Sequence, residues 1–220
     1  MYQERTATRP LESAFETNKV LRNTYALLSM TLLFSALMAA ISVVSQVSYG
    51  IGLIATIAAI VMLWFVLPRT ANSATGIPVI FAITGLLGFG LGPVVGYYLA
   101  ANPTIVMTAL GGTAVIFLGL SAYALTTRKD FSFLAGFLFV GFFVVLAAAL
   151  ANIFLEIPAL FLAVNAAIVL IMSGFILFQT SSIIHGGETN YIMATAGIFL
   201  SLLNMFQALL HLLGAFGGND

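Results

Sequence analysis

Long apolar stretches separated by short polar segments make up most of the chain. A bilayer core about 30 Å thick is crossed by a helix of about 20 apolar residues. Seven stretches are long enough, and they cover residues 25–44, 49–67, 77–99, 103–125, 131–155, 158–178 and 191–216. They are continuous, whereas barrel strands are short and alternate in polarity. Because lipid cannot satisfy backbone polar groups, the pattern predicts an all-α, polytopic transmembrane bundle of seven helices.

Several residues at the edges of these stretches are typical helix boundaries. Asn102 followed by Pro103 indicates an N-cap with proline in the first turn. Asp130 is expected to cap the fifth helix, and Pro158 is expected to open the sixth. Pro93 falls inside the third helix and should kink it or end its first half.

The segments outside the predicted helices are short, so the chain is expected to form one transmembrane domain with a tail at each end. Residues 1–22 are polar and are expected to form a flexible cytoplasmic tail. Residues 23–216 form the predicted transmembrane domain, and 217–220 form a short C-terminal tail. The longest connections, 68–76 and 180–190, leave no room for a separate soluble domain.

Composition supports a membrane protein and excludes several classes of function. The chain is 61% hydrophobic and 6% charged, whereas soluble domains carry about 25% charged residues. Its formal net charge is zero, so a polyanionic partner such as nucleic acid is not indicated. There is no cysteine, which excludes disulfides, thiolate nucleophiles and cysteine-based metal sites.

The basic residues indicate the orientation of the bundle. With seven spans, all of them fall on one side of the membrane, and they are Arg5, Arg9, Lys19, Arg22, Arg69, Arg128 and Lys129. Cytoplasmic loops are rich in Lys and Arg. The pattern therefore predicts a cytoplasmic N-terminus and a periplasmic C-terminus.

A glycine stripe lies in the third predicted helix. Gly88, Gly92 and Gly96 recur every four residues and fall on one face. Such a face lets a second helix approach closely. A nucleotide-binding glycine loop would need a preceding strand, and none is predicted, so the stripe is interpreted as a packing surface.

The last predicted helix carries small and polar residues on one face. They are spaced alternately by four and three, and they are Asn190, Ala194, Gly197, Ser201, Asn204, Ala208 and His211. This face should look inward, because lipid cannot satisfy an amide or an imidazole. Two interpretations stay open. One is a packed seam with interhelical hydrogen bonds worth about 0.6 to 2 kcal/mol each, and the other is a lined cavity or conduction path.

Groups able to carry out chemistry are few. His185 and Glu188 precede the last helix, but the chain has only two histidines, and a metal site needs more converging ligands. Glu156 falls in a short connection on the far side and is expected to be solvated. No aspartate or glutamate falls within a span, and no nucleophile–base pattern is present. Neither catalysis nor a cofactor is expected.

Several separated motifs resemble one family of membrane proteins. They are "TGLLGFGLGPVV" (84–95), "GGTAVIFLGLSAYALTTRKDFSFL" (111–134) and "FLSLLNMFQALLHLLG" (199–214). In this order they resemble the Bax inhibitor family of seven-helix membrane proteins. "NKVLRNTY" (18–25) and "IIHGGETNYI" (183–192) are similar to the bacterial YccA type within that family.

This resemblance implies a regulatory protein of the bacterial inner membrane. Proteins of this type modulate the ATP-dependent membrane protease FtsH and bind it together with its partners HflK and HflC. The polar N-terminal tail is then either a solvated topology signal or a handle for such a cytoplasmic partner. The contact surface and the oligomeric state stay open.

The resemblance also implies an alternative function. Other family members are described as pH-sensitive calcium leak channels in which two aspartates, one on each of the last two helices, share a proton. The matching positions here are Gln179 and Ser201, with Asn204 beside them. Neither Gln179 nor Ser201 titrates near neutral pH, so this switch is not expected. They are instead candidates for a hydrogen bond that closes the seam between the two helices.

Overall fold

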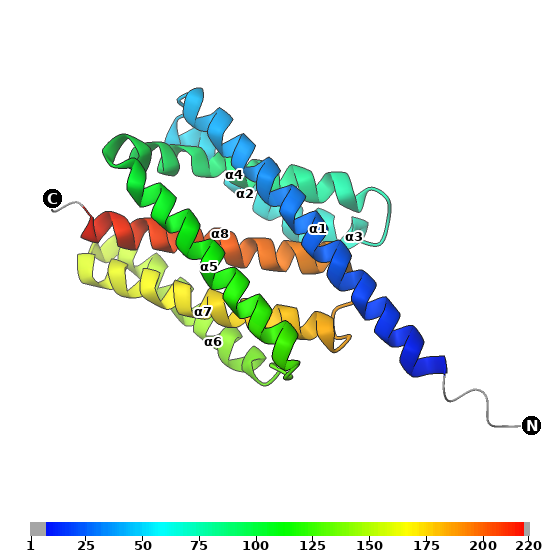
Figure 1. Cartoon of the computed structure of the whole chain (residues 1–220). Helices are drawn as coiled ribbons and strands as arrows, with labels where there is room; N and C mark the ends of the chain where they lie inside the picture. The colour runs from blue at the N-terminus through cyan, green and yellow to red at the C-terminus, as the bar shows by residue number, and fades with distance from the viewer. Residues whose placement is uncertain (1–7, 218–220) are drawn as a thin grey trace, which may run out of the picture.

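The fold was analysed in a computed structural model that describes the backbone of residues 8–217 and the side chains from Lys19 onward (Figure 1). Within this part of the chain, all regular structure is helical. The elements are α1 (Thr8–Val44), α2 (Tyr49–Val61), a π-helical turn η1 (Met62–Val66), α3 (Leu67–Thr70), α4 (Gly76–Ala101), α5 (Pro103–Thr127), α6 (Leu134–Leu155), α7 (Pro158–Ile184) and α8 (Tyr191–Phe216). The segments α2, η1 and α3 together form one span, so the described residues contain seven helices long and apolar enough to cross a membrane. The predicted bundle of seven helices is confirmed.

Some predicted boundaries differ from the structure at the N-terminus and around α7. Helix α1 begins at Thr8, so residues 8–22 of the expected flexible tail are helical, while residues 1–7 and 218–220 lie outside the described part. Helix α7 runs to Ile184 rather than ending near residue 178. Its polar last turn stays helical because Thr180 and Ser181 are buried and bonded to other elements. The connection to α8 is correspondingly shorter than predicted.

Of the predicted helix-boundary residues, Asn102 and Pro158 lie as expected and Asp130 does not. The Asn102 side chain accepts a hydrogen bond from the Thr104 N–H at 3.0 Å, and α7 begins at Pro158, so both of these predictions are confirmed. The prediction for Asp130 is wrong. Its carboxylate accepts from the Ser132 N–H at 2.8 Å, which stabilises a turn, and α6 begins only at Leu134.

Pro68 and Pro93 are accommodated differently. Helix α4 passes through Pro93 without ending there. Pro68 follows η1, in which the Leu67 N–H bonds to the Met62 carbonyl, one residue further back than in an α-helix. A proline ring clashes with the carbonyl four residues earlier, and the wider π-turn before Pro68 gives that ring room.

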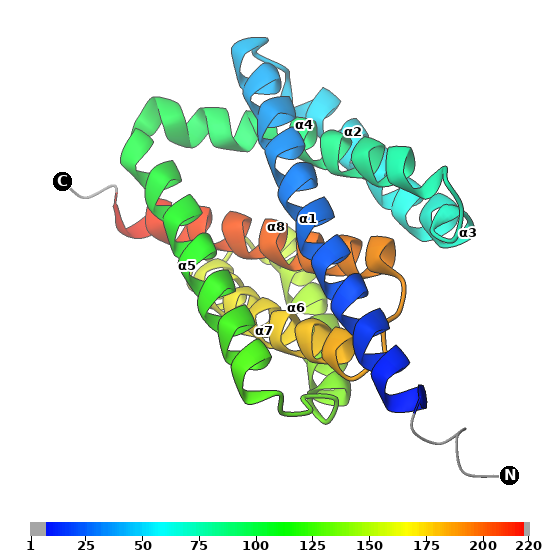
Figure 2. The same ribbon diagram turned by 45° about the vertical axis from the view of Figure 1, so that its right-hand side comes forward.

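Helix α8 lies at the centre of the bundle (Figures 1 and 2). It packs against α1, α4, α5 and α7, whereas α6 rests on α7 at the edge. The apolar faces of α8 are therefore buried too, with Ile198, Met205 and Leu210 fully enclosed. Burial on α8 is therefore not confined to the small and polar face, where Ala194, Ser201 and Ala208 are buried, because neighbouring helices cover its apolar faces as well.

Close contact between α1, α2 and α4 depends on glycine. A Cβ atom added at Gly88 or Gly92 of α4 would overlap Ser35 or Ser42 of α1, and one at Gly90 would overlap Thr56 of α2. At Gly96 the nearest atoms are 3.8 Å away, so this position is less constrained. Two glycine faces of α4 thus let two neighbouring helices approach its backbone.

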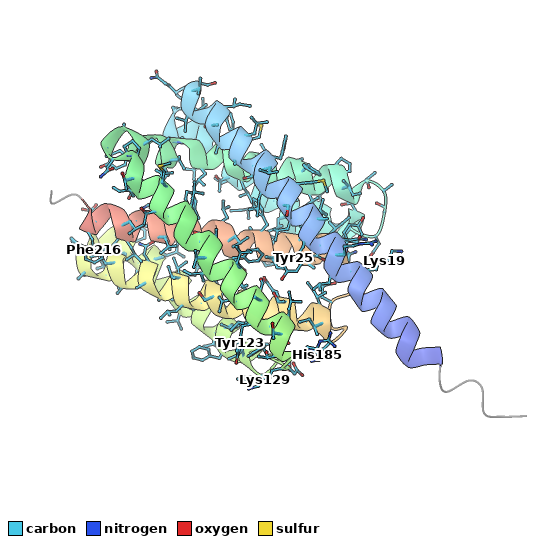
Figure 3. All side chains as sticks on the ribbon, in the orientation of Figure 1. Lys19, Tyr25, Tyr123, Lys129, His185 and Phe216 are labelled. Carbon is cyan, nitrogen blue, oxygen red and sulfur yellow. The ribbon has the colours of Figure 1, made fainter. Side chains whose placement is uncertain are left out.

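The two ends of the bundle differ in charge. Lys19, Lys129 and His185 lie toward one end, and Phe216 lies at the other (Figure 3). Arg69 and Arg128 follow α2 and α5 at that first end, which we call the basic end. The opposite end, where α6 joins α7, is called the far end.

Candidate functional site

The seam between α7 and α8 contains the predicted pair Gln179 and Ser201. The Ser201 hydroxyl lies 3.3 Å from the Gln179 Oε1 and 3.1 Å from the Gly197 carbonyl of its own helix, so its proton is shared between the two acceptors. A Cβ atom at Gly197 would lie 3.0 Å from the Gln179 Nε2. The glutamine amide therefore lies directly over Gly197 in a closely packed seam.

Asn204 does not join this pair. Its amide donates to the Leu200 carbonyl at 2.8 Å within α8. Asn204, Ala208 and His211 border a cavity of about 470 Å³ between α6, α7 and α8 in the far half of the bundle. The polar face of α8 thus divides in two: a closed seam toward the basic end and a lined cavity toward the far end. The first part has the geometry of a packed seam, and the second lines a cavity, while a conduction path stays a prediction.

The cavity also includes polar residues that the sequence analysis missed. Asn165 on α7 and Gln207 on α8 line it, together with Asn152 and Glu156 near the α6–α7 turn. Asn165 is the one carboxamide within the apolar stretch 158–178. An isolated carboxamide in a span was the available signal, since such groups face protein or water rather than lipid.

Asn165 and Asn204 present their side-chain amides in the same way. The Asn165 Nδ2 donates to the Phe161 carbonyl at 2.8 Å, as Asn204 does to Leu200. Asn165 is 4% exposed, and among the described residues no group donates to the Oδ1 of either asparagine. Both residues therefore retain a free acceptor oxygen in the wall of the cavity.

Neighbouring residues fix the shape of the cavity. The Asn152 Oδ1 accepts from the Ile157 N–H at 3.1 Å and holds the α6–α7 turn, where Glu156 adopts a left-handed backbone with φ of 51°. The His211 Nδ1 lies 3.0 Å from the Tyr98 hydroxyl of α4. The His211 ring also packs edge-on against Phe161 of α7, with centroids 5.2 Å apart. His211 thus connects α8 with two other helices.

At the basic end, α7 holds the α5–α6 loop. The Ser181 Oγ accepts from the Phe131 N–H at 3.0 Å and donates to the Lys129 carbonyl at 3.2 Å. The His185 Nε2 lies 3.1 Å from the Arg128 carbonyl. His185 is therefore a structural residue in this loop contact, and among the described residues no group of three or more His, Asp or Glu is placed to hold a metal ion.

Asp130 belongs to the same loop, outside the membrane-spanning segments. Hydrogen bonds from the Ser132 backbone and side chain keep the pKa of the Asp130 carboxyl below its usual value, with a smaller contribution from the nearby His185. The loop around Asp130 is therefore favoured when this carboxylate is ionised.

The loop before α8 is fixed by Glu188 and Asn190. The Asn190 Oδ1 caps α8 by accepting from the N–H groups of Ile192 and Met193, while its Nδ2 donates to the Ala71 carbonyl at 3.0 Å. The Glu188 carboxylate accepts from the Asn190 N–H at 2.8 Å. Asn190, predicted as part of an inward face, thus joins the start of α8 to the end of the second span.

Comparison with known proteins agrees with this architecture. Residues 17–218 match the family described as "Inhibitor of apoptosis-promoting Bax1". The "Modulator of FtsH protease YccA" of Escherichia coli (strain K12) is 54% identical over 203 residues, which cover 92% of each chain. The same identity and coverage are found for the "Inner membrane protein YccA" of E. coli O6:H1. An uncharacterized membrane protein of Vibrio cholerae is 48% identical over 98% of this chain and 97% of its own.

The match extends over all seven spans, and a relative of this similarity is named as an inner membrane protein. The chain is therefore a multi-pass protein of the bacterial inner membrane, and it belongs to the Bax inhibitor family.

Proposed function

We propose that this protein binds the ATP-dependent membrane protease FtsH and modulates its activity. The observation that carries the proposal is the 54% identity, over 92% of both chains, to a protein named as a modulator of that protease. Many polar groups of the described residues serve caps, loop contacts and helix seams. The Ser181 Oγ lies 3.3 Å from the His185 Nδ1, but this serine is buried and its hydroxyl also holds the α5–α6 loop. A regulatory role that depends on binding fits these features better than catalysis.

The proposal includes an orientation in the membrane. The described basic side chains lie at one end of the bundle (Figure 3), and cytoplasmic segments are rich in Lys and Arg. The basic end is then cytoplasmic, with the N-terminus inside and the C-terminus in the periplasm. This orientation places the start of α1 in the compartment where ATP is available.

The start of α1 is the proposed handle for the protease. In Figures 1 and 2 the first turns of α1 project beyond the other helices at the basic end. Later in the same helix, α1 packs closely on α4 and α8. A protease that engages the projecting segment would therefore pull on a helix that is held inside the bundle. Such a substrate would occupy the protease and restrain its degradation of other proteins, with HflK and HflC in the same assembly.

Copurification of FtsH from native membranes tests this mechanism. The full-length chain is compared with a variant lacking residues 2–18 and with a control in which the same residues are replaced by a Gly/Ser segment of equal length. We expect FtsH to copurify with the full-length chain, and its recovery to fall severalfold with both variants. Unchanged recovery with the shortened variant would refute the handle, and no FtsH with any form would refute the proposed partner.

A calcium leak is the alternative function implied by the family. The corresponding seam here carries Gln179 and Ser201 in direct contact, without a titrating group, which argues against a pH-gated path at this point. We expect that liposomes containing the purified protein show no added calcium flux at about pH 6 or at about pH 8. Flux that changes between these two conditions would favour the channel over the regulator.

A further inference from the structure

The cavity in the far half of the bundle has a lining rich in hydrogen-bond acceptors and carries one acid at its edge. We propose that it binds a primary ammonium group, presented either by an aminoethyl-phosphate lipid headgroup or by a small soluble amine. This site is separate from the protease interaction, because the cavity lies at the end opposite the projecting start of α1.

Free acceptor oxygens line the cavity. The amide nitrogens of Asn165 and Asn204 donate to carbonyls of their own helices, so the oxygens are the groups left to face the cavity. A ligand rich in N–H donors would satisfy both oxygens, whereas an anion or a carbonyl-bearing ligand would not.

The cavity carries a negative charge at its edge. Glu156 lines the same cavity, and the described basic residues all lie at the basic end, so none of them neutralises this carboxylate. Glu156 is exposed, so its attraction for a cation is modest and acts together with the amide oxygens. The net preference of the site is therefore for a positively charged donor.

The lining of the cavity suits an organic ammonium better than a metal ion. Calcium takes six to eight oxygen ligands, usually with several carboxylates, and the cavity offers a single acid. The remaining wall is largely apolar and includes Ile153, Val164 and Ile168, with the Phe161 ring beside the polar groups. Aliphatic walls and an aromatic ring suit the carbon atoms and the charge of an organic ammonium, but not a hydrated metal ion.

The route to the cavity favours a ligand that arrives at the membrane surface. A second cavity of about 290 Å³ shares Asn152, Glu156 and Phe161 with the first and continues to Pro158 and Ala215. These positions lie at the helix ends, where the bundle meets the lipid headgroup region. Both a lipid headgroup and a soluble amine can reach Glu156 by this route.

Binding to purified full-length protein in detergent tests the proposal with four probes. The headgroups of phosphatidylethanolamine and phosphatidylcholine are both zwitterionic, but the choline group has no N–H donors. Free phosphoethanolamine and calcium chloride represent a soluble amine and a metal ion. The variants are Glu156→Gln, which changes an exposed side chain, and Asn165→Leu, with Glu188→Gln as a matched control at the opposite end of the bundle.

We expect phosphatidylethanolamine to bind about tenfold more tightly than phosphatidylcholine, the effect of one charge-assisted hydrogen bond. Glu156→Gln should remove this preference and Glu188→Gln should keep it. Competition by free phosphoethanolamine at similar affinity would support the ammonium site with a soluble source, and absence of competition would support the lipid source. Equal binding of the two lipids, no effect of Glu156→Gln, or preferential binding of calcium would overturn the proposal. Because Glu156 is exposed, this result does not depend on whether Asn165→Leu folds.

Discussion

The position of each asparagine decides how its side chain is used. Asn102 and Asn190 lie just before helices, where the side-chain oxygen accepts from backbone N–H groups. Asn165 and Asn204 lie inside helices, where the amide nitrogen donates to the carbonyl four residues earlier and the oxygen remains free. The same side chain therefore caps a helix at its start and offers an acceptor to a cavity in its interior.

Gly88 provides a direct test of the contact between α1 and α4. An added methyl group would overlap the Ser35 backbone, so Gly88→Ala should force the two helices apart and lower the free energy of unfolding by about 1–3 kcal/mol. Thermal unfolding of the purified protein in detergent measures the effect. Gly111→Ala is the control, because a methyl group there meets no atom within 4 Å, and helix propensity alone predicts a gain of up to about 1 kcal/mol. Equal unfolding temperatures for the two variants would contradict the close contact.

Carboxylates at the positions of Gln179 and Ser201 should make stability depend on pH. In the double variant Gln179→Asp, Ser201→Asp, two acids across a closed seam cannot both ionise, so the folded state retains a proton that the unfolded state releases above about pH 4. Stability rises with pH only where the unfolded state binds more protons. Here the folded state binds more, and stability should fall by about 1–3 kcal/mol between about pH 4 and about pH 7.

The measurement is the unfolding midpoint of this variant across that pH range. A control with Gln179→Asn and Ser201→Asn has side chains of similar size and no charge, and it should show no added pH dependence relative to the parent protein. A double-aspartate variant that becomes more stable as pH rises would show that the seam opens to water instead of staying closed.

At the scale of whole elements, hydropathy was sufficient to predict the spans. Seven apolar stretches became seven membrane-length helices, because a chain in lipid must form its hydrogen bonds internally. The boundaries that were wrong lie where tertiary contacts decide. Helix α7 continues to Ile184 because its polar last turn bonds to the α5–α6 loop, and a partner 50 residues away in the chain leaves no local signal.

Where each helix lies in the bundle was harder to predict than whether the helix forms. The pattern on α8 predicted Gly197, Ser201, Asn204 and His211 as one face, but it could not show that Ser201 lies in a seam while Asn204 and His211 line a cavity. That division depends on which residue of α7 lies opposite each turn of α8. Gln179 contacts Ser201, whereas Asn165 and Asn204 both line the cavity. The identity of the facing residue is set by how the two helices pack, and it cannot be derived from the periodicity of one helix.

The α5–α6 loop should depend on a single hydroxyl of α7. Ser181→Ala would leave the buried Phe131 N–H and the Lys129 carbonyl without their partner, at a cost of about 1–3 kcal/mol in unfolding free energy. Hydrogen exchange of residues 128–134, compared with the rest of the chain, measures the local loosening. Ser173→Ala is the control, since Ser173 bonds only to the Val169 carbonyl of its own helix. Equal exchange in the loop of both variants would contradict the role of Ser181.

At the scale of the molecule, the two ends of the bundle have different features. The basic end carries the projecting start of α1 and the loops that α7 and Asn190 hold in place. The far end carries short turns and the acceptor-lined cavity near Glu156. Helix α8 runs through the centre and contributes to both ends. A cytoplasmic partner that engages α1 and a ligand in the far cavity would both act on α8, the first through the packing of α1 on α8 and the second directly, which is a physical route by which one could influence the other.

The orientation on which this depends can be measured with introduced cysteines, because the chain has none of its own. Ser48 is exposed in the turn between α1 and α2, and Ala74 is exposed in the loop before α4, at opposite ends of the bundle. A membrane-impermeant maleimide added to intact spheroplasts should label Ser48→Cys fully. It should label Ala74→Cys only after the membrane is permeabilised, because positively charged segments stay in the cytoplasm. Each variant is the control for the other, since both side chains are accessible to water-soluble reagent once the membrane is opened. The reverse pattern would place the projecting start of α1 in the periplasm, where an ATP-dependent protease cannot engage it, and would exclude the handle mechanism.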